Sequence, residues 1–595
     1  MRFHFYNSVT LILLIMSDFN PLDRARISTH RSSFDLSSKK LFTAKIGEIL
    51  PCYWQIAIPG NKYRISSDWF TRTVPVNTAA YTRIKEYYDF YAVPLRLISR
   101  ALPQAFTQMT DYMTSASSNT SNTSALTSVP YLAQSSLSSF LQTANAGDKP
   151  NVRDDAGLPI VYGSCKLLDL LGYGSLISSS NTGKAAITKK YLGIDNLGDS
   201  DNPLVYQTSQ VVSALPFLAY QKIYFDFFSN SQWEKHKAYA YNVDYWSGSG
   251  SISLVTEMVQ LRYANYPKDY FMGMLPSSQY GSVAALPQTC SSSIPSHVVL
   301  AYNSTPSTSG VSNPAGSTSI VSDASNNSGS VRFLRLNSDL SALSIRATEY
   351  LQRWKEVVQF SSKDYSDQMA AQFGIKAPEY MGNHAHYIGG WSNVININEV
   401  VNTNLDTDSS QASIAGKGIS SQSGHTITYD CGAEHQIIMC VYHAVPMLDW
   451  NLTGQTPQLT VTAISDFPQP AFDQLGMQAV PALNLQNNPG RSVSGSIGYN
   501  LRYWQWKSSI DTVHAGFRAG AAYQSWVAPL DGWQVLTSSG AWSYQSMKVR
   551  PQQLNSIFVP QVDAANCSVA FDQLLCNVNF QVYAVQNLDR NGLPY

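Results

Sequence analysis

The chain has 595 residues, enough for anything from one elaborated domain to about four. Its 40 basic and 40 acidic residues cancel, so any nucleic-acid contact must be local or supplied by another protein. Charged residues make up 13%, against roughly 25% in ordinary soluble proteins, which argues against a free monomer and favours a subunit whose perimeter lies in permanent contacts. The 35 Tyr and 12 Trp suit such a subunit, and they equally suit a secreted sugar-binding β protein.

The first segment of interest is the apolar run SVTLILLIM at residues 8–16. It is shorter than the roughly 20 residues of a membrane helix, and no small-residue cleavage site follows it. We therefore expect residues 1–15 to be a misassigned start or a disordered end, with translation beginning at Met16. An export signal is the alternative.

Residues 16–39 are predicted to form an N-terminal arm. The cations in this arm are interrupted by Asp23 and Asp35, so the charge is modest. A polar arm with several cations can neutralise phosphates without reading bases, whereas a solvated or interface arm needs no DNA at all. The candidate DNA-contacting residues are Arg24, Arg26, Arg31, Lys39 and Lys40.

Strand patterns begin at about residue 40. Apolar residues alternate with others from Cys52 to Ile58, and the sequence Pro59-Gly60-Asn61 predicts a turn into a second strand. The stretch 83–95, RIKEYYDFYAVPL, predicts a further long strand.

The middle of the chain, residues 98–419, loses strand patterning and is expected to form insertions. Helical spacing predicts helices near 215–229, 339–359 and 362–373, the last of them ending at Gly374. The second of these helices carries one apolar stripe: Leu343, Ala347, Tyr350, Leu351, Trp354, Val357 and Val358.

A Ser-, Asn- and Gly-rich stretch lies within this middle region, at residues 282–335. Its central part is too polar to form a core, so it predicts either a surface projection or a linker between domains. Strand patterns resume after 420 and continue to the C-terminus. Strands at 40–97 and 420–595 around a loop-and-helix middle indicate one β-barrel with long insertions.

Residues suited to catalysis or metal binding form no convincing constellation. Cys431, His435, Cys440 and His443 resemble zinc ligands, but on a strand the two histidines would lie about 26 Å apart at roughly 3.3 Å per residue. The seven cysteines are scattered, which favours reduced and mostly buried thiols. We expect no catalytic residue, no cofactor and no metal site.

Several segments in succession carry a family resemblance. They are SSFDLSSKKLFTAKIGEILPCYWQIAIPGNKYRISSDWFTRTVPV, ALPFLAYQKIYFDFFSNSQW, LRYANYPKDYFMGMLPSSQYG, the stretch from LNSDLSALSIRATEY to NVININEVVNT, AFDQLGMQAV, and the terminal NFQVYAVQNLDRNGLPY. In this order they resemble the major capsid proteins of microviruses, in particular the gokushovirus-like and gut-associated branch. The resemblance runs from about residue 18 to the end. Residues 1–15 have no counterpart, and Tyr595 stands where the family has glycine.

This resemblance implies a single eight-stranded antiparallel jelly-roll barrel and a structural role in the virion, not an enzyme. The subunit would self-assemble in the bacterial host cytoplasm into a small icosahedral shell around a circular single-stranded DNA genome. Implied partners are a small basic DNA-packaging protein, a minor pilot protein and a host receptor, but no membrane. Residues 282–335 become the candidate surface protrusion. A secreted carbohydrate-binding or glycoside-hydrolysing β-sandwich is the alternative.

Overall fold

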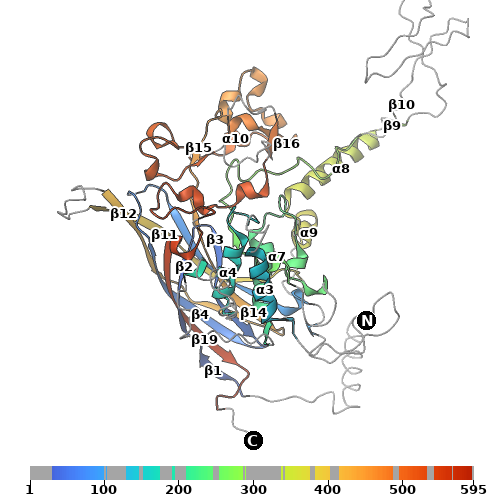
Figure 1. Cartoon of the computed structure of the whole chain (residues 1–595). Coiled ribbons are helices and arrows are strands. Elements are labelled where there is room, and N and C mark those ends of the chain that lie inside the picture. The colour runs from blue at the N-terminus through green and yellow to red at the C-terminus, as the bar shows by residue number, and fades with distance from the viewer. Residues whose placement is uncertain are drawn as a thin grey trace, which may run out of the picture.

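Two layers of antiparallel strands form the centre of the molecule (Figure 1). The computed structural model describes residues 30–78, 80–99, 102–103, 129–145, 152–173, 191–193, 210–245, 254–285, 288–289, 337–338, 342–375, 382–401, 414–486, 495–531, 542–565 and 567–591. Across these residues the protein is mainly β, as the alternating sequence pattern predicts.

The first layer has one face in solvent. It runs from β2 (Ser38–Ala44) through β19 (Leu574–Gln586) and β4 (Lys62–Thr73) to β12 (Ile414–Ser423) and β13 (Ile427–Asp430), which both pair with β4. Side chains of β4 and β19 alternate between buried and exposed along almost their whole length. This alternation is the signature of an antiparallel sheet with one solvated face. β1 (Ser32–Asp35) also pairs with β19.

The second layer is buried more completely. Its order is β3 (Glu48–Ala57), β14 (Gln436–Pro446), β5 (Ile84–Pro94) and β11 (His386–Val401), and β8 (Arg262–Tyr263) adds to the outer side of β3. Every residue of β14 is buried, which matches its nearly continuous apolar sequence QIIMCVYHAVP. β11 joins the layers, because residues 386–395 pair with β5 and residues 396–401 pair with β12.

Aromatic side chains fill the space between the layers. Tyr53 of β3 and Phe580 of β19 lie 5.4 Å apart between ring centroids, and Trp69 of β4 lies 5.3 Å from Tyr88 of β5. Rings that meet across the layers bury large apolar areas, and their tilted geometry adds a favourable interaction energy. The core therefore holds strands from both ends of the chain together.

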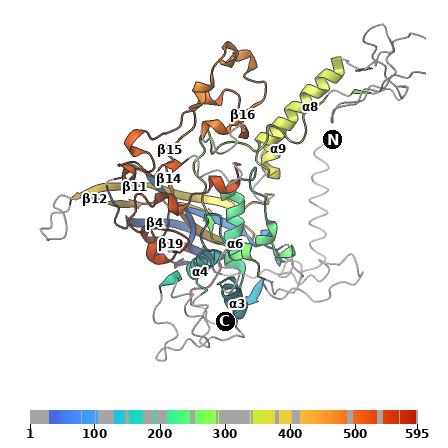
Figure 2. The same ribbon diagram turned by 45° about the horizontal axis from the view of Figure 1, so that its top comes forward.

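Helices from the middle of the chain cover the outer face of the second layer (Figure 2). α6 (Leu215–Ile223), which continues as the π-helical turn η3 (Tyr224–Phe228), contacts β5 and β14 and is buried over its full length. α4 (Ile160–Leu170) contacts β3, and α3 (Gln134–Asn145) packs on α4. α7 (Thr256–Val259) completes this cover.

A separate lobe lies above the sheets and consists mostly of short turns (Figure 1). Its strand pairs are β15 (Trp450–Asn451) with β18 (Leu530–Asp531) and β16 (Met477–Pro481) with β17 (Ser496–Leu501), beside the short helix α10 (Trp504–Lys507). The remaining short elements are η2 (Leu95–Leu97), β6 (Tyr131–Ala133), β7 (Val211–Ser213), η4 (Ala238–Ala240), η5 (Val243–Tyr245), η7 (Pro457–Thr460), η8 (Ile464–Asp466), η9 (Pro470–Phe472), η10 (Ala482–Asn484), η11 (Ala515–Phe517), η12 (Gln524–Trp526), η13 (Tyr544–Met547), η14 (Pro551–Leu554) and η15 (Val569–Phe571).

Two further helices lie beside the lobe (Figure 1). α8 (Ala342–Phe360) extends away from the sheets, and α9 (Tyr365–Phe373) lies next to its inner end. They correspond to the helices expected at 339–359 and 362–373. Asp364 caps α9 by accepting from the Ser366 backbone N–H, and Gly374 ends it at φ 67°. The apolar stripe of α8 has the expected spacing, but its N-terminal half is exposed.

The sheets also differ from the sequence expectation in their extent. β11 and the start of β12 lie before residue 420, in the part of the chain assigned to insertions, because Asn and Ser on one side of β11 hide its strand pattern. Much of 447–571, expected as barrel, forms the lobe. Within the expected arm, residues 32–35 form β1, and residues 38 and 39 begin β2.

Candidate functional site

The solvent face of the first layer carries several cations among polar and exposed apolar side chains, and one of these cations, Lys62, is paired with Asp430 of β13 at 3.1 Å. Lys62, Arg64 and Arg72 are exposed on β4, and each faces a residue of β19 on the same side of the sheet. The Arg72 guanidinium lies 4.7 Å from the centre of the Phe70 ring, a cation–π contact. Amide and hydroxyl side chains fill much of the rest of this face: Ser66, Asn577, Asn579, Gln581, Ser421 and Ser423.

The structure describes three of the five predicted DNA-contacting residues and places them at different positions on the sheet. Arg24 and Arg26 lie outside the described residues. Arg31 donates from Nε to the Asn587 side chain at 2.7 Å, which ties it to the end of the sheet. Lys39 and Lys40 are exposed on β2, and Lys39 pairs with Asn579 of β19, so it shares the face that carries Arg72.

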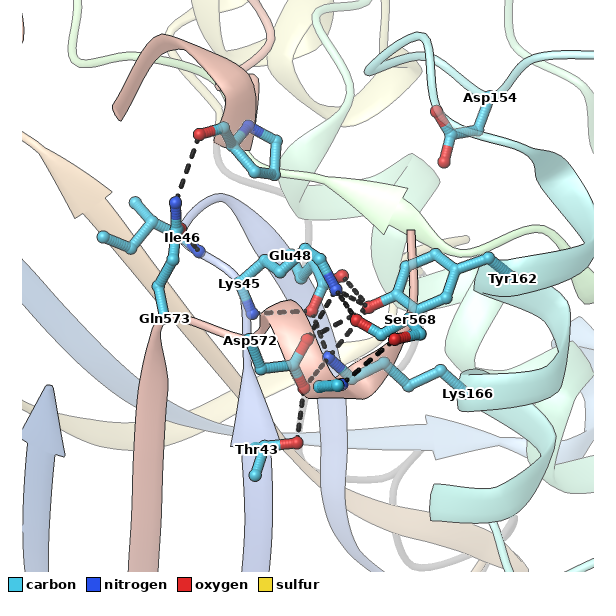
Figure 3. Close-up of polar contacts among 12 residues, drawn as sticks. Thr43, Lys45, Ile46, Glu48, Asp154, Tyr162, Lys166, Ser568, Asp572 and Gln573 are labelled. Atoms are coloured by element: carbon cyan, nitrogen blue, oxygen red, sulfur yellow. Dashed lines mark hydrogen bonds and ion pairs between the residues drawn. The ribbon is translucent and has the colours of Figure 1, made fainter. Parts of the chain in front are cut away.

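A buried ionic cluster joins the sheets to the insertion helix α4 (Figure 3). It consists of Lys45, Glu48, Lys166 and Asp572, whose side chains are at most 4% exposed. Lys45 lies 2.6 Å from Asp572, and Lys166 lies 2.6 Å from Glu48 and 2.9 Å from Asp572.

Tyr162 lies at the centre of this ionic cluster. The Lys45 ammonium donates to the Tyr162 hydroxyl at 2.6 Å, and that hydroxyl donates to Glu48 at 2.8 Å. Since Tyr162 and Lys166 both come from α4, the cluster fastens this helix to the segments before β3 and β19.

The charges of the ionic cluster balance, two positive against two negative. Burial acts to lower the pKa of Lys166, but attraction to Asp572 and Glu48 outweighs it and the pKa is raised. Burial likewise acts to raise the pKa of Asp572, and the two lysines outweigh it, so that pKa is lowered. Both groups therefore stay charged near neutral pH. Hydrogen bonds also satisfy these buried charged groups. We therefore assign the ionic cluster a structural role.

Asp154 is a second buried carboxyl group beside α4. Its side chain accepts from the Ala156 and Leu158 backbone N–H groups and from the Tyr263 hydroxyl of β8 at 2.8 Å. No cation in the described contacts is hydrogen-bonded to it, and burial raises its pKa to about 7. It is drawn apart from the ionic cluster in Figure 3.

The raised pKa of Asp154 gives a pH dependence of stability. The folded-state pKa lies above the ordinary 3.8, so folding favours the protonated acid and its stabilisation is lost as pH rises from about 4 to 7. The Asp154→Asn variant is neutral at every pH at this position. Between about pH 4 and 7, we expect its free energy of unfolding to rise relative to that of the natural protein by about 1 kcal/mol per pH unit. Chemical unfolding at several pH values measures this difference. A difference that does not vary with pH would contradict it.

The cysteine and histidine side chains that resemble zinc ligands do not converge. Cys440 points into the core, where its backbone oxygen lies 3.5 Å from the Cys52 sulfur, and His443 stacks on Tyr87 with ring centroids 4.8 Å apart. No group of three potential metal ligands occurs in the part of the chain that the structure describes. The six cysteines within that part are buried and form no disulfide with one another.

Sequence reasoning predicted the cations of the N-terminal arm but missed the cations of β4 and the ionic cluster. The β4 cations have a visible signal, because KYRISSDWFTRT alternates polar and apolar residues over its whole length. The ionic cluster has only a faint one: Lys166 is a charged residue within the otherwise apolar IVYGSCKLL. Its partners Glu48 and Asp572 are 118 and 406 residues away in the chain, so no spacing rule finds them.

A charge-poor protein of antiparallel sheets with exposed apolar side chains on a projecting helix is typical of structural subunits that associate. Comparison with known sequences is consistent with that class. The model of the family "Capsid protein (F protein)" matches residues 25–137 and 200–593. The chain therefore belongs to this capsid protein family.

A curated relative agrees with the family assignment. Capsid protein VP1 of Chlamydia phage 1 is 25% identical over 211 residues, which cover 34% of this chain and 34% of that protein. The match thus spans about a third of the relative's length. The family assignment gives no support to the alternative of a secreted sugar-binding or sugar-hydrolysing protein. In the described residues, no helix has the length and apolar character needed to cross a bilayer.

Proposed function

We propose that this chain is the major capsid protein of a bacteriophage and that its copies self-assemble into a small icosahedral shell around a circular single-stranded DNA genome. The observation that carries the proposal is the family match, which covers strands from both ends of the barrel. The role is structural and not enzymatic. Assembly takes place in the host cytoplasm, and the finished protein resides in the virion.

The barrel is proposed to be an eight-stranded jelly roll. The support is its pairing order, β2–β19–β4 with β12 and β13 in one layer and β3–β14–β5–β11 in the other. Strands that follow one another in the sequence, such as β2 and β3 or β4 and β5, alternate between the layers, as in a double-layer Greek-key fold. Such closure leaves few free strand edges, so loops and insertions are available for contacts with neighbouring copies.

The genome is proposed to contact the arm residues Arg24, Arg26, Arg31, Lys39 and Lys40 together with the solvent face of the first layer. Lys39 supports this, because it lies on the same face as the cations of β4. Because the chain is neutral, a small basic packaging protein is proposed to supply further positive charge, and a minor pilot protein to join the particle.

We expect the triple substitution Lys62→Ala, Arg64→Ala and Arg72→Ala to weaken binding of single-stranded DNA and to reduce its dependence on salt. Each lost phosphate contact should lower the slope of log K against log salt by about 0.7. Fluorescence anisotropy with a labelled oligonucleotide at several salt concentrations measures the slope. Lys507→Ala, an exposed cation in the lobe, is the control. An unchanged slope in the triple variant would exclude this face as the DNA contact.

The surface protrusion is proposed to comprise residues 282–335 and to contact a host receptor. β9 (Gln288–Thr289) pairs with β10 (Asn337–Ser338) beyond the N-terminal end of α8, the end that points away from the sheets (Figure 1). The chain on either side of residues 290–336 therefore meets at the outer end of a projecting helix, which supports the proposal.

The assembly proposal is tested with the purified full-length chain. We expect sedimentation and electron microscopy to show capsomers or closed particles when salt, divalent ions and single-stranded DNA are varied. A protein that remains monomeric under all of these conditions would exclude the proposed function.

A further inference from the structure

The exposed part of α8 has the residue spacing of a coiled coil. Leu343, Ala347, Tyr350, Trp354 and Val357 are separated by four, three, four and three residues. This 3.5-residue period places them on one narrow line along the helix, the seam through which two helices pack.

Most of this seam lies in solvent within one copy of the chain. Leu343 is 75% exposed, Tyr350 is 68% exposed and Trp354 is 45% exposed, and Ala347 between them is also exposed. Single apolar residues on a surface are ordinary, but an aligned apolar row on a projecting element marks an interaction site. Among the residues that the structure describes, the seam from Leu343 to Tyr350 is thus a helix face without a partner inside the subunit.

The base of α8 is held firmly, so the direction of the helix is fixed. Gln352 donates to Gln279 at 2.5 Å, and Lys355 donates to the backbone oxygen of Ser282 at 2.6 Å. Trp354 donates to Gln372 of α9 at 3.2 Å. Below this point Val357 and Val358 are half-buried against the body. In both views α8 points away from the sheets (Figures 1 and 2).

The residues beside the seam indicate what covers it. Arg346 and Arg353 flank one side, and Leu351 and Val358 flank the other. If two α8 helices met antiparallel, arginine would face arginine, which is repulsive. In a parallel pair, Arg346 of one copy faces Leu351 of the next and can cover it with its aliphatic stem.

We propose that α8 packs in parallel against α8 of neighbouring copies of this chain, around a symmetry axis that runs along the helices. Parallel contacts between identical helices require cyclic symmetry, which a shell of identical subunits supplies. The proposal rests on the proposed capsid function and names one of its contact surfaces. The projecting end of each subunit would then be held by its neighbours.

Single cysteines placed along the seam test this arrangement in assembled particles. We expect the single variants Leu343→Cys, Ala347→Cys and Tyr350→Cys each to form disulfide-linked dimers under mild oxidation, since a parallel seam brings like residues together. Non-reducing electrophoresis measures the linked fraction. The control Ile345→Cys lies on the opposite side of the helix, is 49% exposed in its natural form, and should stay unlinked like the unsubstituted chain.

The cross-linking pattern can overturn the proposal in two ways. Linkage at one seam position only would indicate antiparallel or crossing helices, and equal linkage at Ile345→Cys and the seam positions would indicate random collision. The absence of linkage in well-formed particles would exclude the contact.

A second variant separates this inference from the proposed function. Leu343→Ser with Tyr350→Ser should keep the melting temperature of the free subunit, because both side chains are exposed, but lower the yield of particles at least tenfold. Ile345→Ser should assemble normally. If the unsubstituted chain assembles and the double variant assembles equally well, only the α8 contact is excluded. If the unsubstituted chain never assembles, the capsid function itself fails.

Discussion

Replacement of Asp572 with alanine is expected to lower the free energy of unfolding of the subunit by about 3–5 kcal/mol, because it leaves an uncompensated positive charge in the interior. Asp572 is 1% exposed and pairs with Lys45 and Lys166. It also accepts a hydrogen bond from Thr43. Chemical unfolding of the purified subunit measures the loss. The ion pair of Asp473 with Lys507 is the control, since both side chains are more than 40% exposed and Asp473→Ala should cost about 1 kcal/mol or less.

A double substitution tests whether charge is the cause. Lys45→Met with Asp572→Leu removes one cation and one anion and leaves the pair of Lys166 with Glu48 intact. This variant should be more stable than Asp572→Ala, because no unpaired charge remains buried. If both variants lose the same free energy, lost packing and not charge explains the effect.

The ionic cluster also has an expected acid response. The pKa of Asp572 is lowered in the folded state, so its stabilisation is present above the ordinary carboxyl pKa and is lost as pH falls through the folded value. Asp154 responds in the opposite direction, because its pKa is raised to about 7. Mild acid should therefore increase the contribution of Asp154 to the free energy of unfolding, whereas stronger acid should destabilise the fold by protonating Asp572.

The sequence predicted those parts of the fold that have local periodicity. β4 alternates strictly, and α6 and α9 have helical spacing with a proline at the start or a glycine at the end. The residue pattern alone did not predict β11, because polar residues interrupt its apolar side and its identity as a strand depends on pairing with β5 and β12. The lobe was missed because short turns have no period.

Sequence reasoning was weakest for contacts between residues that are distant in the chain. Lys45 and Asp572 are separated by 527 positions, yet their side chains are in contact. The α8 stripe shows a different limit, because its spacing was recognised correctly but spacing alone does not say whether the covering surface belongs to the same copy.

Trp391 provides the second large effect, since it fills the space where β11 crosses between the layers. Its side chain is buried, its ring lies 5.2 Å from Phe90, and its indole N–H donates to the His425 backbone oxygen at 2.8 Å. We expect Trp391→Ala to lower the free energy of unfolding by about 3–5 kcal/mol through lost burial and the cavity left behind. Trp354→Ala, which removes a half-exposed indole from α8, should cost the free subunit far less.

Gly424 allows this packing to be tested in reverse. A Cβ atom at Gly424 would lie 2.4 Å from the Trp391 ring, so Gly424→Ala should destabilise the natural protein by about 1–3 kcal/mol. In a Trp391→Ala background the ring is gone, and the added methyl group should cost little or should fill part of the cavity. A double-mutant cycle measures this interaction directly. If the two losses simply add, the ring and the glycine are not in contact, and the packing described for β11 against the turn after β12 is wrong.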